Sequence, residues 1–393
     1  MQRDRRGLAR IPLLSYGFRP FFLGGAIWAA VAMALWIGEL SGAWSFAEAY
    51  GPVAWHAHSL LFGYVTAIVA GFLLTAIPNW TGRLPVRGGP LLALFILWIA
   101  GRLALLCVDR IGIIAAILVD SSFLLVFALV ILREIAAGRN WKNLKTVALL
   151  LLMAASNIGF HLEVLLDGSA DISIRAGTAA IIGMIMLIGG RITPSFTRNW
   201  LVRSGAAALP APFGRYDVVT LAVSGLGLAF WILAPTGIVT GSILLAAAGL
   251  QLIRLWRWAG RSTWQEPLVL ILHVGYLFVP LGFALVGASI LRPAAIPAAD
   301  ALHAWTVGAV AVMTIAVMTR ATLGHTGRDL VASPLTRMIY FTLVTAVVCR
   351  LAVPFAPGAT MPLLTLAAIG WIAGFLGFAT VFGPMLLRSR LAS

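Results

Sequence analysis

Residues 55–77 read Trp-His-Ala-His-Ser-Leu-Leu-Phe-Gly-Tyr-Val-Thr-Ala-Ile-Val-Ala-Gly-Phe-Leu-Leu-Thr-Ala-Ile, an apolar run without Asp, Glu, Lys or Arg. A helix needs about 20 mostly apolar residues to cross a bilayer, so this run predicts a transmembrane helix. Two histidines, His56 and His58, lie near its start. Hydrocarbon gives an imidazole nothing in place of its lost water, and ionisable side chains inside such helices are therefore functional candidates.

Eleven further runs of this kind predict an all-α polytopic membrane protein with twelve transmembrane helices. The expected spans are 20–40, 55–77, 90–108, 111–132, 146–166, 174–192, 217–234, 236–254, 266–290, 299–319, 336–355 and 361–386. The 393 residues are 61% hydrophobic and 10% charged, and no polar stretch is long enough to fold outside the bilayer. We expect residues 1–393 to form one transmembrane domain, with residues 1–19 as a cytoplasmic tail.

The distribution of positive charge predicts the orientation of the helices. The net charge is +15, and with the N-terminus inside, nearly all basic residues fall in inside segments. The exceptions are Arg102, Arg110, Arg175, Arg292 and Arg350. Cytoplasmic loops of membrane proteins carry such an excess of Lys and Arg, so both termini are expected in the cytoplasm. Because these residues are spread over short loops, they indicate contact with lipid headgroups and argue against a nucleic-acid partner.

A weak internal repeat relates the second and tenth spans. A glycine follows five residues after each of His58 and His303. A Thr-Gly-Arg sequence ends each span, and its distance from the histidine is the same in both spans. The sixth span ends in a similar way, at residues 193–198. Related helices at positions two, six and ten predict three units of four helices each.

Four histidines are expected at one depth near the outer surface: His56, His58, His161 and His303. Imidazole is a versatile ligand for haem iron, copper and zinc. His58 and His303 open the two helices that are most alike, so we predict that they are the two axial ligands of one haem. His56 and His161 are then candidate ligands of copper or of a second site. The alternative for each is a hydrogen-bonding group between helices.

A second group of polar residues lies toward the cytoplasm. His273 and His325 share this side with Arg191 and Arg320. A second metal or anion site is one interpretation, with the two arginines as partners of an anion or of haem propionates, because a desolvated guanidinium needs an anionic or carbonyl partner. The alternative is a solvated, positively charged rim with arginines that extend to the interface.

Three acidic and basic residues lie within the outer halves of the spans. Arg102 and Asp120 match in depth across a short hairpin, which predicts an ion pair inside the membrane, with a proton path as the alternative. Glu163 is close to His161 and is expected either to orient that imidazole or to mark the lipid interface. No CxxCH motif for covalent haem attachment is present.

The residues quoted above, with several others, resemble the NnrS family over nearly the whole chain. The segments that carry the resemblance are Gly17-Phe18-Arg19-Pro20-Phe21-Phe22, Trp55-His56-Ala57-His58, residues 71–82, Phe160-His161, Gly189-Gly190-Arg191, Leu272-His273 and residues 323–328. One departure is Ser59-Leu60, where we expect an acidic residue and Met. The resemblance implies a bacterial inner-membrane protein that contains haem and copper and is associated with nitric oxide metabolism and nitrosative stress. Without a covalent attachment motif, the haem would be haem b.

These expectations leave three functions open. The first is a haem- and copper-binding protein that handles nitric oxide or a related small molecule, with a redox partner. The second is a proton-coupled transporter or small-molecule carrier, in which histidines relay protons. The third is a haem-based sensor or accessory protein without turnover. Whether the protein is an enzyme does not follow from the residues.

Overall fold

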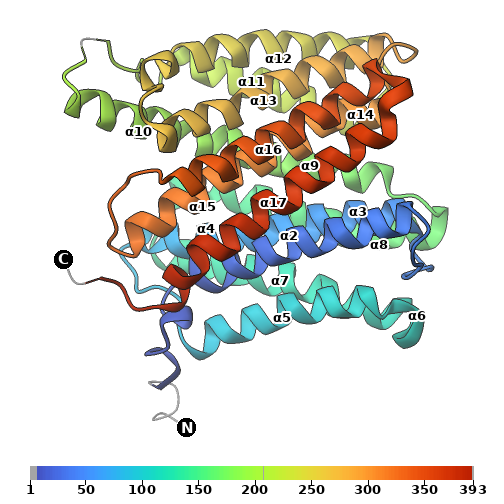
Figure 1. Ribbon diagram of the computed structural model, residues 1–393, viewed down its shortest axis with the longest axis horizontal. Coiled ribbons are helices and arrows are strands. Elements are labelled where there is room, and N and C mark those ends of the chain that lie inside the picture. Colours follow the sequence, from blue (N-terminus) through green and yellow to red (C-terminus); the bar gives the residue numbers. More distant parts are fainter. Residues whose placement is uncertain (1–6, 207, 392–393) are drawn as a thin grey trace. The chain divides into compact units, whose positions relative to one another are not determined.

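The computed structural model describes residues 7–206 and 208–391, and within these ranges the chain is all-helical, without a strand (Figure 1). Twelve helices are long and apolar enough to cross a membrane, which confirms the expected number. They are Phe18–Leu40, Pro52–Thr81, Gly89–Leu106, Ile113–Ala137, Trp141–Asp167, Asp171–Arg203, Arg215–Leu233, Ile238–Trp256, Pro267–Leu291, Ala298–His325, Pro334–Phe355 and Pro357–Leu387. The protein is therefore a multi-pass membrane protein.

Two spans continue well beyond their expected ends. The sixth reaches Arg203 and the tenth reaches His325, whereas the expected spans end at residues 192 and 319. Threonine hydroxyls in these polar ends donate to carbonyls one turn earlier, as Thr197 does to Thr193 and Thr326 to Thr322. Such side chains remain compatible with a helix after the apolar pattern has ended.

The contacts between residues divide the described chain into two compact units. Unit 1 comprises residues 1–180, 321–329 and 375–393, and unit 2 comprises residues 181–320 and 330–374. The expectation of a single domain stays a prediction.

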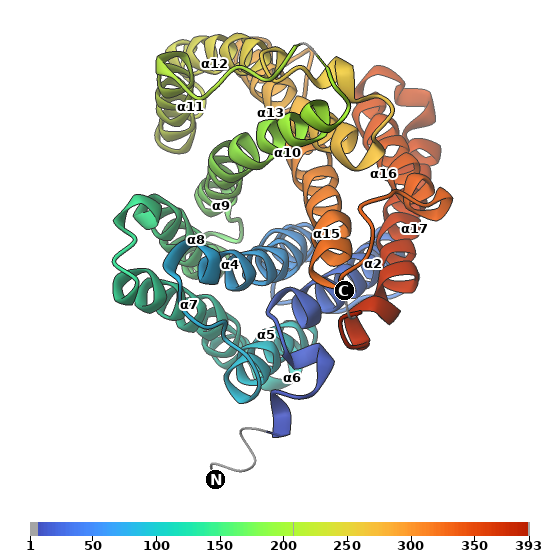
Figure 2. The same ribbon diagram turned by 90° about the vertical axis from the view of Figure 1, so that its left-hand side faces the viewer.

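Unit 1 contains the first five spans. Its helices are α2 (Phe18–Leu40), α3 (Pro52–His58), α4 (Val65–Thr81), α5 (Gly89–Leu106), α6 (Val108–Ile111), α7 (Ile113–Ala137) and α8 (Leu144–Asp167), with the 3₁₀ turns η1 (Pro12–Leu14) and η3 (Trp141–Asn143). Helix α7 packs against α4, α5 and α8, and α2 packs against α4 (Figure 2). Helix α7 is thus central to the unit, which brings its polar side chains close to those of α5 and α8.

Unit 2 contains the seventh, eighth, ninth and eleventh spans, together with parts of three others. Its helices are α10 (Gly190–Arg203), α11 (Arg215–Leu233), α12 (Ile238–Trp256), α13 (Pro267–Leu291), α14 (Ala298–His303) and α16 (Pro334–Ala352), with η5 (Gly260–Thr263), η7 (Val353–Phe355) and η8 (Pro357–Ala359). Helix α12 packs against both α11 and α13 (Figure 2). Helices α9 (Asp171–Met184), α15 (Val312–His325) and α17 (Thr360–Leu387) belong partly to each unit.

Three spans contain a π-helical segment, and they are the second, sixth and tenth. These segments are η2 (Ser59–Tyr64), η4 (Ile185–Gly189) and η6 (Ala304–Ala311). Each of these segments contains a glycine, which is Gly63, Gly189 or Gly308. Single π-helical turns inside α-helices are rare and frequently lie at functional sites. Their recurrence supports the proposed relation among spans two, six and ten, which stays a prediction at the level of three four-helix units.

Candidate metal centre

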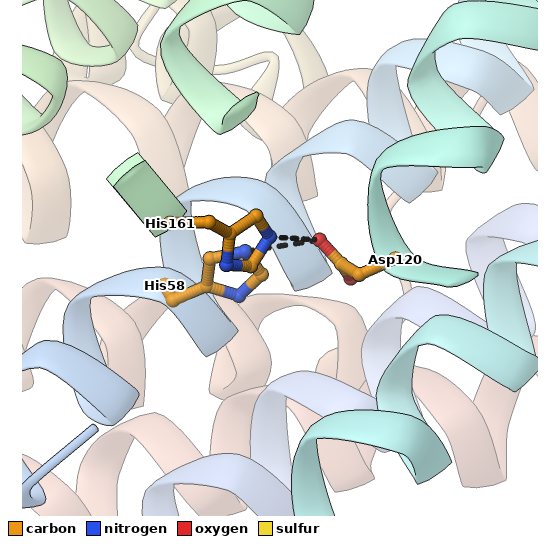
Figure 3. A group of neighbouring side chains, drawn as sticks. All are labelled: His58, Asp120 and His161. Atoms are coloured by element: carbon orange, nitrogen blue, oxygen red, sulfur yellow. Dashed lines mark hydrogen bonds and ion pairs between the residues drawn. The ribbon is translucent and has the colours of Figure 1, made fainter. Parts of the chain in front are cut away.

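Three side chains from three helices of unit 1 converge on one point. His58 ends α3, Asp120 lies in the first half of α7, and His161 lies in the second half of α8 (Figure 3). The Nε2 atom of each imidazole is 3.1 Å from the same carboxylate oxygen, Oδ2 of Asp120. Together these residues offer three ligand atoms within 4.8 Å of one another.

The cluster lies in an apolar and aromatic environment. His58, Asp120 and His161 expose 1%, 2% and 0% of their surface, which leaves no room for bulk water around them. Phe160 meets the edge of the His58 ring, and Phe62 packs against both of these rings. Charged groups in such surroundings must be paired or must hold a metal ion.

Three side chains donate hydrogen bonds to carbonyl groups of the π-helical segment η2, which begins directly after His58. The indole N–H groups of Trp28 and Trp98 each donate across 2.9 Å, to the carbonyls of Ser59 and Gly63. The guanidinium of Arg102 donates to the Phe62 carbonyl at 3.0 Å. A Cβ at Gly63 would lie 2.6 Å from the Arg102 Nη1 and 2.7 Å from the Trp28 Nε1, so only glycine lets both side chains reach the segment.

Arg102 also forms an ion pair with Asp120, as the sequence predicts. Its Nη2 donates to Oδ1 of Asp120, and both side chains are buried. The close approach of the two helices depends on Gly101, because a Cβ there would lie 2.8 Å from Oδ1 of Asp120. Removing one member of a buried ion pair leaves an uncompensated charge and typically costs about 3–5 kcal/mol, so loss of either side chain alone should destabilise unit 1.

Asn157 of α8 brings a third nitrogen to Oδ2 of Asp120. Its Nδ2 lies 2.9 Å from Oδ2 and 3.0 Å from Nε2 of His58. An ionised carboxylate only accepts hydrogen bonds, and the Asn157 amide nitrogen only donates. If Asn157 donates to both neighbours, Nε2 of His58 has no proton and its lone pair faces the carboxylate. If Nε2 of His58 is instead protonated, its N–H group donates to Oδ2 of Asp120, beside the N–H groups of His161 and Asn157.

Oδ2 of Asp120 then accepts three hydrogen bonds and Oδ1 accepts one from Arg102, so hydrogen bonds alone satisfy the carboxylate. Reversing the Asn157 amide would set its oxygen against the ionised carboxylate. A cation that replaced the protons on the two Nε2 atoms would also be held by Oδ2. In addition, Nδ1 of His58 and Oδ1 of Asn157 are buried without a hydrogen-bond partner.

The second nitrogen of His161 is hydrogen-bonded to a residue of the loop between α2 and α3. Nδ1 of His161 lies 2.6 Å from the hydroxyl of Tyr50, which precedes α3 and is itself buried. The loop is held by Asp109, whose carboxylate accepts from the backbone N–H groups of Glu48 and Ala49. Burial, and the negative charge of Asp120, raise the pKa of Tyr50, so its phenol stays protonated at neutral pH. Tyr50 thus covers the cluster from the side of this loop and fixes the His161 ring.

His303 belongs to a separate group in unit 2. Its Nδ1 is 2.6 Å from the carbonyl of Ala299, which only accepts, so the shorter of the two contacts of Nδ1 favours a proton there and the lone pair on Nε2. Arg350 lies 3.1 Å from the same Nδ1 and forms an ion pair with Asp300. A backbone carbonyl on Nδ1 is the usual way in which a ligating histidine is oriented through its second nitrogen.

The other three histidines lie in different surroundings. His56 stacks on Trp36, with ring centroids 4.4 Å apart, and does not join His58 in the cluster. His273 lies 2.8 Å from the Thr197 hydroxyl, against Gly260. His325 is exposed and stacks on Tyr16. Among the described residues, none of these three belongs to a group that could hold a metal ion.

The two arginines that the sequence groups with His273 and His325 differ in burial. Arg191 is exposed, whereas Arg320 is buried and stands over the ring of Phe196 at 4.1 Å. Arg320 follows His303 by 17 residues on one continuous span, which corresponds to about 25 Å along a helix. A haem held by His303 therefore does not reach Arg320 with its propionates.

Glu163 does not orient His161. Its carboxylate accepts from the backbone N–H groups of Ile172 and Ser173 and so caps the first turn of α9. Asp120, and not Glu163, is the carboxylate that contacts His161. Tyr50 was missed as a functional residue, because a tyrosine in an irregular loop carries no sequence signal that ties it to His161.

Comparison with known proteins agrees with this picture of a membrane protein. The family model described as NnrS protein matches residues 12–390. No match was found among curated proteins or among solved structures. Because the family model covers nearly the whole chain, the protein belongs to the NnrS family.

Proposed function

We propose that the protein is a copper- and haem-binding protein of the bacterial inner membrane that acts in nitric oxide metabolism or in the response to nitrosative stress. The observation that carries the copper site is the meeting of both imidazoles and one carboxylate at Oδ2 of Asp120. The association with nitric oxide comes from the family resemblance. Copper would supply one-electron chemistry at this site.

The spacing of the donor atoms fits a small metal ion. Ligands about 2.0–2.2 Å from an ion, at angles near tetrahedral, lie roughly 3.3–3.6 Å from each other, and the donor atoms here approach that spacing. The distance between Nε2 and Oδ2 is 3.1 Å for both His58 and His161. Two imidazoles and one carboxylate are a donor set that copper and zinc accept.

The residues around the cluster would orient the ligands of a bound metal ion and keep water away from it. When a metal takes Nε2 of His161, the remaining proton of this imidazole lies on Nδ1 and is donated to the Tyr50 oxygen. Asn157 donates to Oδ2 of Asp120 and orients the carboxylate. Phe62 and Phe160 exclude water from the site.

For haem b, His303 is the histidine with the best fit. Its Nδ1 proton is bound by the Ala299 carbonyl, so Nε2 presents a lone pair in the manner of an axial ligand. The pairing of His303 with His58 stays a proposal. His58 has Nε2 enclosed by Asp120 and Asn157, and only its Nδ1 is without a partner.

One observation favours a second function, a proton-coupled transporter. Tyr50, His161 and Asp120 form a continuous hydrogen-bonded chain from the loop between α2 and α3 to the buried carboxylate. Intramembrane chains of this kind serve as proton relays in pumps and transporters. A transporter of this type would work without a bound transition metal.

Metal analysis and an optical spectrum of the purified protein separate the two functions. The protein is produced in cells supplied with copper and a haem precursor, and it is purified without chelators. We expect about one copper per chain and the Soret and α bands of haem b, which sharpen on reduction with dithionite. Absence of both copper and haem from such protein would refute the proposal and favour the transporter.

Orientation is tested by a reporter fused after Ser393. With twelve spans and the observed asymmetry of basic residues, both ends are expected in the cytoplasm. Alkaline phosphatase should then be inactive and green fluorescent protein fluorescent at this position. The reverse pattern would contradict the proposed orientation. A second fusion in the loop between Gly42 and Gly51 should give the opposite signal.

A further inference from the structure

The donor cluster differs from most metal sites in its charge balance. Asp120 supplies one negative charge, but this charge is already compensated by Arg102 within hydrogen-bonding distance. The two imidazoles are neutral when they bind a metal. The group of Arg102, Asp120, His58 and His161 thus has no net charge before an ion enters.

A metal ion in such a group contributes its full charge to a buried, apolar site. The Born cost of burying an ion grows with the square of its charge, so a divalent ion costs about four times as much as a monovalent one. The nearby guanidinium adds repulsion that is twice as large for the divalent ion. Both effects favour a monovalent ion over Zn²⁺ or Cu²⁺.

We propose that Arg102 tunes the His58–Asp120–His161 site to bind copper as Cu(I) in preference to divalent ions. The inference rests on the proposed function, because it assumes that this cluster holds copper. Arg102 acts as a positioning and charge-compensating residue, and it does not bind the metal itself. Its bond to the Phe62 carbonyl keeps the guanidinium in place beside Asp120.

The size of the effect follows from Coulomb's law. A carboxylate shared between a guanidinium and an ion holds the two positive charges about 5 Å apart, and at an effective dielectric constant near 20 each added charge changes the binding constant by roughly a hundredfold. Replacing Arg102 by a neutral residue should therefore raise the affinity for Zn²⁺ relative to Cu(I) by about this factor. A one-electron reduction potential changes by about 59 mV for each tenfold change in relative affinity. Replacing Arg102 should therefore lower the reduction potential of bound copper by about 120 mV.

The test compares metal selectivity in Arg102→Gln, Arg102→Lys and the wild type. Cu(I) and Zn²⁺ affinities are measured in detergent with competing chelators, and the potential of bound copper is measured by redox titration. Arg102→Gln should shift the affinity ratio about a hundredfold and lower the potential. Arg102→Lys keeps the charge and should change the ratio by no more than a factor of a few.

Unit 2 offers a matched control for the loss of a buried guanidinium. Arg254 forms a buried ion pair with Asp217 and also donates to a π-segment carbonyl, that of Met186. Arg254→Gln therefore removes a similar group without touching the cluster, and it should leave the affinity ratio unchanged. A shift in Arg254→Gln as large as that in Arg102→Gln would overturn the proposal, and so would an equal shift in Arg102→Lys.

The wild-type protein gives a second test that needs no variant. After loading with equal amounts of Cu(I) and Zn²⁺ and prolonged dialysis, it should retain Cu(I) and lose Zn²⁺. Retention of Zn²⁺ as firm as that of Cu(I) would overturn the inference while leaving the proposed metal site intact. If neither ion binds, and His161→Ala behaves like the wild type, the proposed function itself fails.

Discussion

His161→Ala should purify with almost no copper, whereas the wild type should carry about one copper per chain. The substitution removes one of three ligands and leaves Oδ2 of Asp120 with only His58 and Asn157 beside it. His161 is buried and contacts Tyr50 through its other nitrogen, so no nearby donor replaces it. Copper is measured by mass spectrometry of the purified protein, with folding checked by size-exclusion chromatography.

Two further variants test this prediction, one with a smaller expected loss of copper and one as a control. Tyr50→Phe removes only the partner of Nδ1 of His161, and loss of such an outer partner typically lowers metal affinity by about 10–100-fold. His325→Ala alters an exposed histidine outside the cluster and should retain full copper content. Equal copper content in His161→Ala and His325→Ala would show that the cluster does not hold the metal. Asp120→Asn is less informative, since it also breaks the buried ion pair with Arg102.

The second large effect concerns haem. His303→Ala should lose most of the haem spectrum and should keep its copper, because His303 is oriented as a ligand by Ala299 and lies outside the cluster. The measurement is the pyridine haemochrome content together with the copper content of the same sample. A normal haem spectrum in His303→Ala would end the assignment of this residue as an axial ligand.

His58→Ala decides whether the two histidines share the haem. The cluster predicts loss of copper from this variant, as from His161→Ala. The sequence-based pairing of His58 with His303 predicts, in addition, loss of haem. Loss of copper with an intact haem spectrum would restrict His58 to the copper site and would require another second ligand for the haem.

The helical framework could be predicted because it depends on composition along the chain. Twelve apolar runs give twelve spans, and the largest differences are at the polar ends of spans six and ten, where Thr197 and Thr326 donate hydrogen bonds back to their own helices. The pairing of Arg102 with Asp120 was also predictable, because one short hairpin joins their helices and sets their depths.

The composition of the cluster was less predictable. Depth alone suggested that His58 and His161 lie at one level, but depth does not specify which helices are lateral neighbours. The contact of both imidazoles with Asp120 depends on the packing of α7 against α4 and α8. The partners of a short polar side chain, such as Asn157 or Glu163, are likewise set by tertiary packing rather than by the local sequence pattern.

The order in which the cluster residues occur along the chain has a consequence for biosynthesis. His58, Arg102, Asp120 and His161 lie on four consecutive spans, so the ribosome completes the whole donor set before it translates most of unit 2. A charged residue at the centre of a single helix costs about 2.5–3.5 kcal/mol during insertion. Arg102 and Asp120 reduce this cost for each other if α5 and α7 enter the bilayer together as a hairpin. The ion pair thus lets this hairpin insert before His161 has been synthesised, and a metal ion bound at the proposed site would enter only after α8 has been inserted.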